Sequence, residues 1–212
     1  MPTVQNLRGK IRSVGATDVG KVREHNEDTI GVDADIGLLV LADGMGGYNA
    51  GEVASGIAVK TVMSLVKEAI ERQDLTADDR ESGLSRPSIV LRDSIMRANK
   101  IIYQTAKTQP QCEGMGMGTT IVACLFFDNK VAIAHVGDSR LYRLRASRFE
   151  QMTLDHSLLQ ELVDRGFYSQ EEADAKQAHY QVTLLCVAPA RVGGGGRRRR
   201  FAGRHGNVRP FL

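Results

Sequence analysis

The stretch Ile36-Gly37-Leu38-Leu39-Val40-Leu41-Ala42 runs directly into Asp43-Gly44-Met45-Gly46-Gly47. The first seven residues are apolar on both alternating faces, a pattern typical of a strand in the interior of a sheet. Such a strand would carry the Asp43 carboxylate to its end, and the glycines after it would let backbone carbonyls approach a bound ion. An isolated Asp-Gly is usually only a turn. The motifs around it therefore decide between a turn and a site.

Two amphipathic helices are expected after this strand. The first covers residues 50 to about 72, and the second ends before Pro110. A polar loop at residues 73–88 separates them. The residues expected to face the core are Ala54, Ala58, Val62, Leu65 and Ala69 in the first helix and Leu91, Ile95, Ala98 and Ile102 in the second.

The rest of the pattern predicts mainly strands. Residues 11–18 and 29–33 precede the central strand as short candidates, and residues 119–127, 131–136 and 141–145 follow the helices. A turn at residues 128–130 would place Asn129 in a left-handed conformation. Residues 155–177 indicate two short helices separated by Gly166. This order favours an α+β layered domain over a doubly wound fold.

Length and composition favour one globular domain in a reducing compartment. The chain has 212 residues, 42% of them hydrophobic, which allows one well-buried core. Its three cysteines form no CxxC pair, so neither a disulfide framework nor a thiolate zinc site is indicated. The first residues lack a signal-peptide pattern, and the longest apolar run, residues 121–127, is too short to cross a bilayer. We expect a cytoplasmic protein outside the membrane.

The excess of basic residues lies near the end of the chain. Residues 179–212 contain seven Arg and no acidic residue, so residues 1–178 carry 21 basic and 25 acidic residues, a net charge of −4. The Gly- and Arg-rich composition predicts a disordered or out-of-frame tail. RNA binding by this tail is an alternative, but nucleic-acid binding by the domain is not favoured. We therefore expect a domain at residues 1–178 and a tail at residues 179–212.

Further motifs supply charge and oxygen ligands. Arg23-Glu24-His25-Asn26-Glu27-Asp28 precedes the central strand, and Gly137-Asp138-Ser139-Arg140 follows residues 131–136. Phosphate-ester hydrolysis needs a nucleophile at neutral pH and compensation of negative charge, which paired divalent cations provide. Carboxylates are the ligands that such cations prefer, and the planar Arg23 guanidinium suits phosphate oxygens. Each motif alone is more simply a solvated turn or surface charge, but together they predict metal-dependent phosphate hydrolysis.

Other chemistries lack their motifs. The sequence has no Ser-His-Asp order, GxSxG elbow or CxxxxxR loop, so a covalent mechanism is not indicated. His25, His135 and His156 do not have the spacing of metal ligands.

In combination and order, the polar motifs resemble the PPM (PP2C-like) family of metal-dependent protein serine/threonine phosphatases, in its bacterial form. The resemblance covers roughly residues 9–178. Its matching segments are Thr17-Asp18-Val19-Gly20, Arg23 to Asp28, Asp43 to Gly47, Ala50 to Ala54, Met117 to Thr120 and Gly137 to Arg140.

The resemblance implies a fold and a site. The fold would be a PP2C-like β-sandwich flanked by helices in α-β-β-α layers, with residues 155–175 as a mobile flap. Arg23 would hold the phosphate of the substrate, and a metal-activated water would hydrolyse phosphoserine or phosphothreonine. The implied metal site uses Asp43 to bridge two Mn²⁺ or Mg²⁺ ions, the Gly44 carbonyl and Glu27 on these ions, Asp138 for a third ion, and Asp28 and Asn26 as supporting residues.

The resemblance also implies phosphorylated proteins as substrates and a partner Ser/Thr kinase. Family members carry two further aspartate ligands in late Ser-Asp-Gly and Asp-Asn segments, whereas no Asp follows Asp174 here. We therefore expect a C-terminally truncated or frameshifted member with an incomplete fold and impaired activity, because close cations need surrounding anionic ligands. The alternative is a non-catalytic module that binds phosphoproteins through Arg23.

Overall fold

Strand β1 (Asp28–Asp33) and strand β2 (Leu38–Gly46) open a five-stranded antiparallel sheet in the computed structural model. The structure describes residues 7–46, 49–72, 75, 83–108, 116–127, 129–156, 163, 166, 169, 171–172 and, for the backbone, 184–187. Helices α1 (Ala50–Arg72) and α2 (Arg86–Thr108) follow. The remaining strands are β3 (Met117–Thr119), β4 (Ile121–Phe127), β5 (Lys130–Val136), β6 (Arg140–Arg145), β7 (Arg148–Gln151) and β8 (Leu184–Val187).

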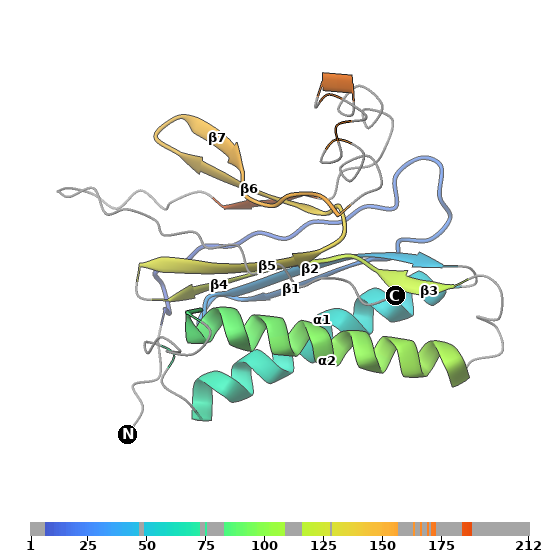
Figure 1. The fold of residues 1–212 in the computed structure, drawn as a ribbon, viewed down its shortest axis with the longest axis horizontal. Helices are drawn as coiled ribbons and strands as arrows, with labels where there is room; N and C mark the ends of the chain where they lie inside the picture. Colours follow the sequence, from blue (N-terminus) through green and yellow to red (C-terminus); the bar gives the residue numbers. More distant parts are fainter. Residues whose placement is uncertain are drawn as a thin grey trace.

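The long strand β2 organises the first sheet. It pairs with β1 on one side and with β4 on the other, and its last residues, 44–46, pair with β3. Strand β5 continues the sheet beyond β4. A second sheet has the order β7-β6-β8, and it lies on the side of the first sheet opposite to the helices (Figure 1).

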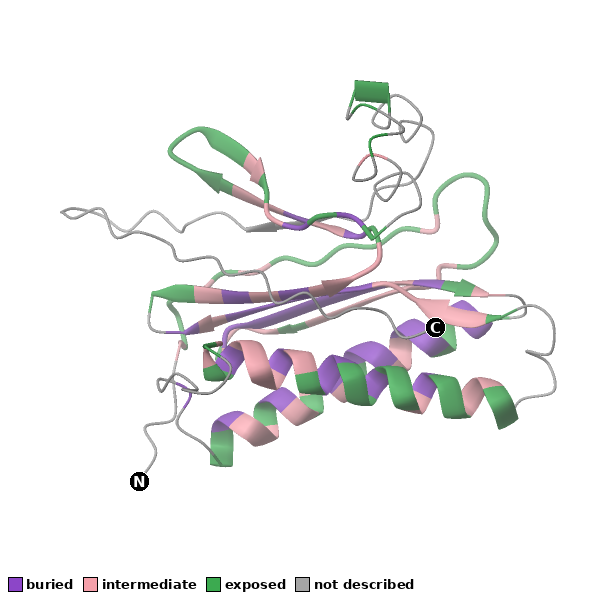
Figure 2. Cartoon of the chain, viewed as in Figure 1, coloured by how far each residue is buried: buried purple, intermediate pink, exposed green. Residues whose placement is uncertain are grey.

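The core lies on both faces of the first sheet. Leu38, Val40 and Ala42 belong to the larger apolar cluster, which includes the buried faces of α1 and α2. Leu39 and Leu41 belong to a smaller cluster on the other face, which includes Leu141 of β6. Figure 2 shows the buried residues concentrated along β2 and β4 and on the sheet-facing sides of the helices. The continuous apolar run therefore reflects burial on both faces.

The described residues confirm the α+β prediction and contain three of the four expected layers: helices, sheet and sheet. A second helical layer lies outside the described residues, as do most of the expected flap at residues 155–175 and the tail from residue 188. Strand β8 falls inside the segment for which we expected no regular structure, and it pairs in parallel with β6. Neither α1 nor α2 is long and apolar enough to span a membrane.

Some local predictions were wrong. Residues 11–18 form no strand, and Val14 is 95% exposed, so no packing holds this segment in a sheet. Helix α2 begins at Arg86, which shortens the predicted loop. Residues 119–127 do not form one strand, because a break at Thr120 separates β3 from β4. The short strand β7 was missed. Asn129 does adopt the expected left-handed conformation, with φ of 58°.

Candidate metal and phosphate site

Asp28 and Asp43 face each other across the β1–β2 ladder. They are partners in the antiparallel register, and their carboxyl groups form a hydrogen bond. Burial and then the neighbouring Asp43 charge raise the pKa of Asp28, while a hydrogen bond from Thr17 and the charge of Arg23 lower it. The ladder therefore places two carboxyl groups where their negative charges repel.

The loop before β1 holds Asp28 in position. Thr17 Oγ1 donates a hydrogen bond to Asp28 Oδ2 at 3.3 Å and accepts one from Asn26 Nδ2 at 2.8 Å. Asn26 Oδ1 in turn accepts the Asp28 amide at 3.0 Å, a local bond that asparagine forms readily in turns. Asn26 therefore supports Asp28, as expected, through contacts that also include Thr17.

Glu27 lies between the loop and the start of α1. Its side chain is 16% exposed, and Oε2 lies 3.9 Å from Arg23 Nη1, while the Arg23 side chain is 59% exposed. A Cβ atom built on Gly51 would stand 2.6 Å from Glu27 Oε1, so this carboxylate sits against the first turn of α1. A helix N-terminus favours negative charge. Arg23 and Glu27 thus form an exposed cationic and a sheltered anionic group beside Asp28.

Gly44 is the point of closest backbone approach in this region. A Cβ atom there would lie 2.1 Å from the Gly51 carbonyl oxygen and 2.6 Å from the Glu27 carbonyl oxygen. The Gly44 amide donates to the Glu27 carbonyl at 3.1 Å, and Ser55 Oγ donates to the same carbonyl at 2.6 Å. Only glycine fits between these groups, so the backbone of Asp43-Gly44 is held close to Glu27 and α1.

Asp138 lies apart from the other carboxylates. It is exposed on the loop between β5 and β6, and within the described residues no three His, Cys, Asp or Glu side chains form a group that could hold a metal ion. The loop is nevertheless connected to Asp43. The Asp43 amide donates to Thr120 Oγ1 at 3.1 Å, and that hydroxyl lies 2.6 Å from Ser139 Oγ. The structure therefore brings the backbones of the two motifs together without adding the Asp138 carboxylate to the pair.

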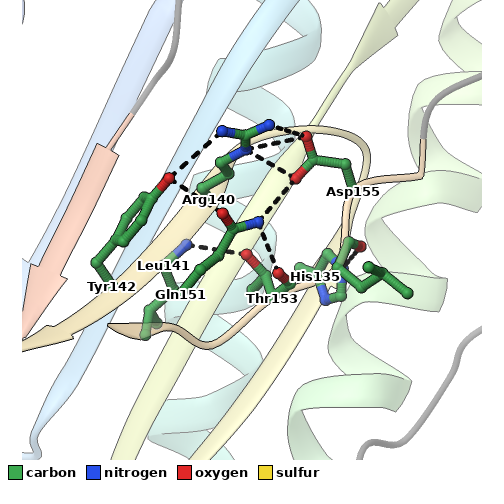
Figure 3. A network of polar contacts seen from close by, with 8 residues as sticks. His135, Arg140, Leu141, Tyr142, Gln151, Thr153 and Asp155 are labelled. Atoms are coloured by element: carbon green, nitrogen blue, oxygen red, sulfur yellow. Dashed lines mark hydrogen bonds and ion pairs between the residues drawn. The ribbon is translucent and has the colours of Figure 1, made fainter. Parts of the chain in front are cut away.

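The segment after β7 closes around the Asp138 loop (Figure 3). Arg140 donates from Nε and Nη2 to both carboxylate oxygens of Asp155, at 2.7 to 3.0 Å. His135 Nε2 donates to the Leu154 carbonyl at 2.7 Å, and the His156 amide donates to the Gly137 carbonyl at 3.0 Å. These contacts bind residues 154–156 to both sides of the loop.

The donors present fit a hard divalent cation. Carboxylate oxygens are the ligands that Mg²⁺ and Mn²⁺ prefer, and the Asp28–Asp43 pair offers them in a place where a cation would relieve the repulsion that raises the pKa of Asp28. Motif analysis found these carboxylates but did not assign roles to Thr17 or Ser55. Their hydroxyls act on residues 11 and 28 positions away, so no local spacing indicates them.

The chain is similar in sequence to known protein phosphatases. Residues 20–171 match the family model described as Protein phosphatase 2C. The serine/threonine phosphatase stp of Listeria welshimeri is 41% identical over 160 residues, which are 74% of this chain and 59% of that protein. The serine/threonine protein phosphatase PstP of Mycobacterium tuberculosis is 38% identical over 179 residues, 84% of this chain and 31% of that protein. The chain thus spans less than two thirds of these relatives.

Solved structures of the same kind have a similar fold. The crystal structure of the M. tuberculosis phosphatase PstP/Ppp gives a TM-score of 0.60 at 36% identity, covering 78% of this chain and 62% of that one. The catalytic domain of PstP in complex with two manganese ions gives 0.57 at 36% identity, covering 73% and 60%. With more than half of its residues matched by the family model, this chain belongs to the protein phosphatase 2C family.

Proposed function

We propose that this protein hydrolyses phosphoserine and phosphothreonine in phosphorylated proteins and requires Mn²⁺ or Mg²⁺ to do so. The observation that carries the proposal is the Asp28–Asp43 carboxyl pair beside Arg23 and Glu27, in a chain whose relatives are named serine/threonine phosphatases. A pair of carboxyl groups that repel each other is a natural place for cations, and an exposed Arg next to it is a natural place for phosphate.

Each residue has a proposed role. Asp43 and the Gly44 carbonyl would hold the cations, with Glu27 and Asp28 close to them and Asp138 reserved for a third ion. When bound, the cations would supply an activated water and offset the negative charge of the phosphoryl group. Arg23 would orient the phosphate through its guanidinium, because its side chain is exposed and faces Glu27 only at 3.9 Å. The exposed position leaves the phosphate accessible from a protein surface.

We further propose that the 212-residue chain binds at least one cation weakly. Residues 175–212 contain neither Asp nor Glu, so the two late aspartate ligands implied by the family resemblance have no counterpart in that segment. Two cations held close together repel unless anionic ligands surround them. We expect turnover to be slow and to need a high concentration of Mn²⁺.

The proposed substrates are proteins phosphorylated by a Ser/Thr kinase that shares a compartment with this chain. We propose the cytoplasm as that compartment, because the cysteine spacing indicates no disulfide framework. A kinase partner is proposed only from the chemistry, since a phosphatase needs an enzyme that makes its substrate.

The test is release of phosphate from a phosphothreonine peptide by the purified 212-residue chain, with Mn²⁺ and with EDTA. We expect Mn²⁺-dependent release that Asp43→Asn abolishes. Asp35→Asn is a matched control, because Asp35 is an exposed aspartate in the β1–β2 turn. Phosphopeptide binding without any release would instead support the non-catalytic module, and Mn²⁺-independent release would contradict the proposed role of the cations.

A further inference from the structure

Thr120 occupies the break between β3 and β4, directly opposite Asp43. Its amide donates to the Asp43 carbonyl at 2.8 Å, and its Oγ1 accepts the Asp43 amide at 3.1 Å. In a regular antiparallel pair both bonds would join backbone groups. Here a side-chain hydroxyl takes the place of one carbonyl, so the peptide groups on both sides of the Asp43 Cα depend on one threonine.

The same hydroxyl reaches the loop that carries Asp138. Thr120 Oγ1 lies 2.6 Å from Ser139 Oγ, and Ser139 is only 3% exposed. The Thr120 methyl group also packs against this loop, because a Cβ atom on Gly137 would lie 2.7 Å from Thr120 Cγ2. Gly137 adopts φ of 102°, which other residues rarely adopt. The loop is therefore shaped to lie on Thr120.

We propose that Thr120 is a positioning residue for cation binding. Its hydroxyl fixes the Asp43 backbone and the Asp138 loop in one relative geometry, and Mn²⁺ affinity depends on that hydroxyl. The inference rests on the proposed function in one respect, which is that Asp43 is a cation ligand. Groups that orient metal ligands through hydrogen bonds matter for affinity, because a ligand that must be ordered on binding binds less tightly.

The test uses two variants that separate the hydroxyl from the methyl group. Thr120→Val keeps the shape and removes the hydroxyl, whereas Thr120→Ser keeps the hydroxyl and removes the methyl group. Thr105→Val is the control, since Thr105 Oγ1 donates to the Ile101 carbonyl within α2 and contacts no residue of the site in any recorded hydrogen bond of the described chain. Calorimetric titration of Mn²⁺ into the full 212-residue chain measures the affinity of each variant.

We expect Thr120→Val to weaken Mn²⁺ binding about tenfold or more, the size of effect that outer groups of metal sites have. Thr120→Ser should restore most of the affinity, and Thr105→Val should leave it unchanged. A second readout needs no metal. Amide hydrogen exchange at Asp43 should accelerate in metal-free Thr120→Val and stay slow in Thr120→Ser, because only the hydroxyl accepts that amide. If Thr120→Val does not fold, Ser139→Ala replaces it and removes the hydroxyl partner of Thr120.

Three results would overturn the inference: wild-type affinity in Thr120→Val, an equal loss in Thr105→Val, or no uptake of Mn²⁺ by the wild-type chain. A wild-type chain that binds Mn²⁺, loses affinity in Thr120→Val and releases no phosphate would refute the proposed function and leave the inference standing.

Discussion

Asp28 lies directly opposite Asp43 in the β1–β2 ladder, where burial and the Asp43 charge together raise the pKa of Asp28. The raised pKa means that the folded protein holds a proton more tightly at this position than the unfolded chain does. Folding is therefore favoured by Asp28 at acidic pH and opposed by its ionisation at neutral pH.

Replacing Asp28 by Asn should stabilise the metal-free protein at neutral pH. In the wild type, the contribution of Asp28 to stability is fully present below its ordinary pKa of 3.8 and is lost as pH rises through the raised value. Urea denaturation in EDTA, across about pH 4 to 7, should show that the variant gains most over the wild type at the upper end. Mn²⁺ should reverse the order by stabilising the wild type more. A variant that is less stable than the wild type at neutral pH without metal would contradict this prediction.

The buried face of α1 leads to a second prediction. Buried residues recur every fourth position, at Ala50, Ala54, Ala58, Val62, Val66 and Ile70. Val66→Ala should therefore destabilise the protein by about 2 kcal/mol, the lost burial of two carbon atoms plus a cavity. Leu65→Ala removes more atoms but should cost less, because Leu65 is only partly buried. Urea denaturation of both variants decides the order, and a larger loss for Leu65→Ala would restore the face predicted from the sequence.

That helix shows what the sequence could and could not predict. Its bounds, 50 and 72, follow from the helical spacing of apolar residues and are confirmed. The face was right as far as Val62 and wrong after it, because both Leu65 and Val66 are apolar. Four-residue steps wind slowly around a helix of 3.6 residues per turn. Only contact with the twisted sheet and with α2 selects which of the two apolar lines is buried.

The site shows the same division. The motifs around Asp28, Asp43 and Asp138 are visible in the sequence because carboxylates and glycines after apolar strands are local patterns. The bonds that hold them are not local. Thr120 acts on Asp43 across 77 positions and on Ser139 across 19, and the break in the strand at Thr120 looks like continuous β-propensity in residues 119–127. The cation-binding roles of the motif residues remain predictions.

A third prediction concerns the ion pair between Arg140 and Asp155. Their side chains are 17% and 3% exposed, so removing Arg140 leaves a carboxylate in a place with little water. Arg140→Gln should cost roughly 3–5 kcal/mol in urea denaturation. The double variant that also carries Asp155→Asn should recover part of this loss, because no buried charge is then left without its partner.

Arg143 supplies the matched comparison. It pairs with Glu150 on the same sheet, but the two side chains are 27% and 41% exposed. Water and salt screen such a pair, so Arg143→Gln should change the free energy of unfolding little. Equal losses for Arg140→Gln and Arg143→Gln would show that burial does not distinguish the two ion pairs.

The last prediction concerns His156, whose ring stacks on His135 with 4.6 Å between ring centroids. Burial and then the charge of His135 lower the pKa of His156 below its ordinary value of 6.5, against an opposing effect of Asp155. The folded state therefore prefers neutral His156. Its contribution to stability is present above pH 6.5 and is lost as pH falls through the lowered pKa.

Titration of the His156 ring by NMR should give a pKa below 6.5 in the wild type. His135→Gln removes the second cause but leaves His156 partly buried, so the pKa of His156 should rise only part of the way toward its ordinary value. A full return to 6.5 in that variant would assign the shift to charge repulsion alone. No change would assign it to burial alone, and a wild-type pKa above 6.5 would mean that Asp155 dominates the environment of the ring.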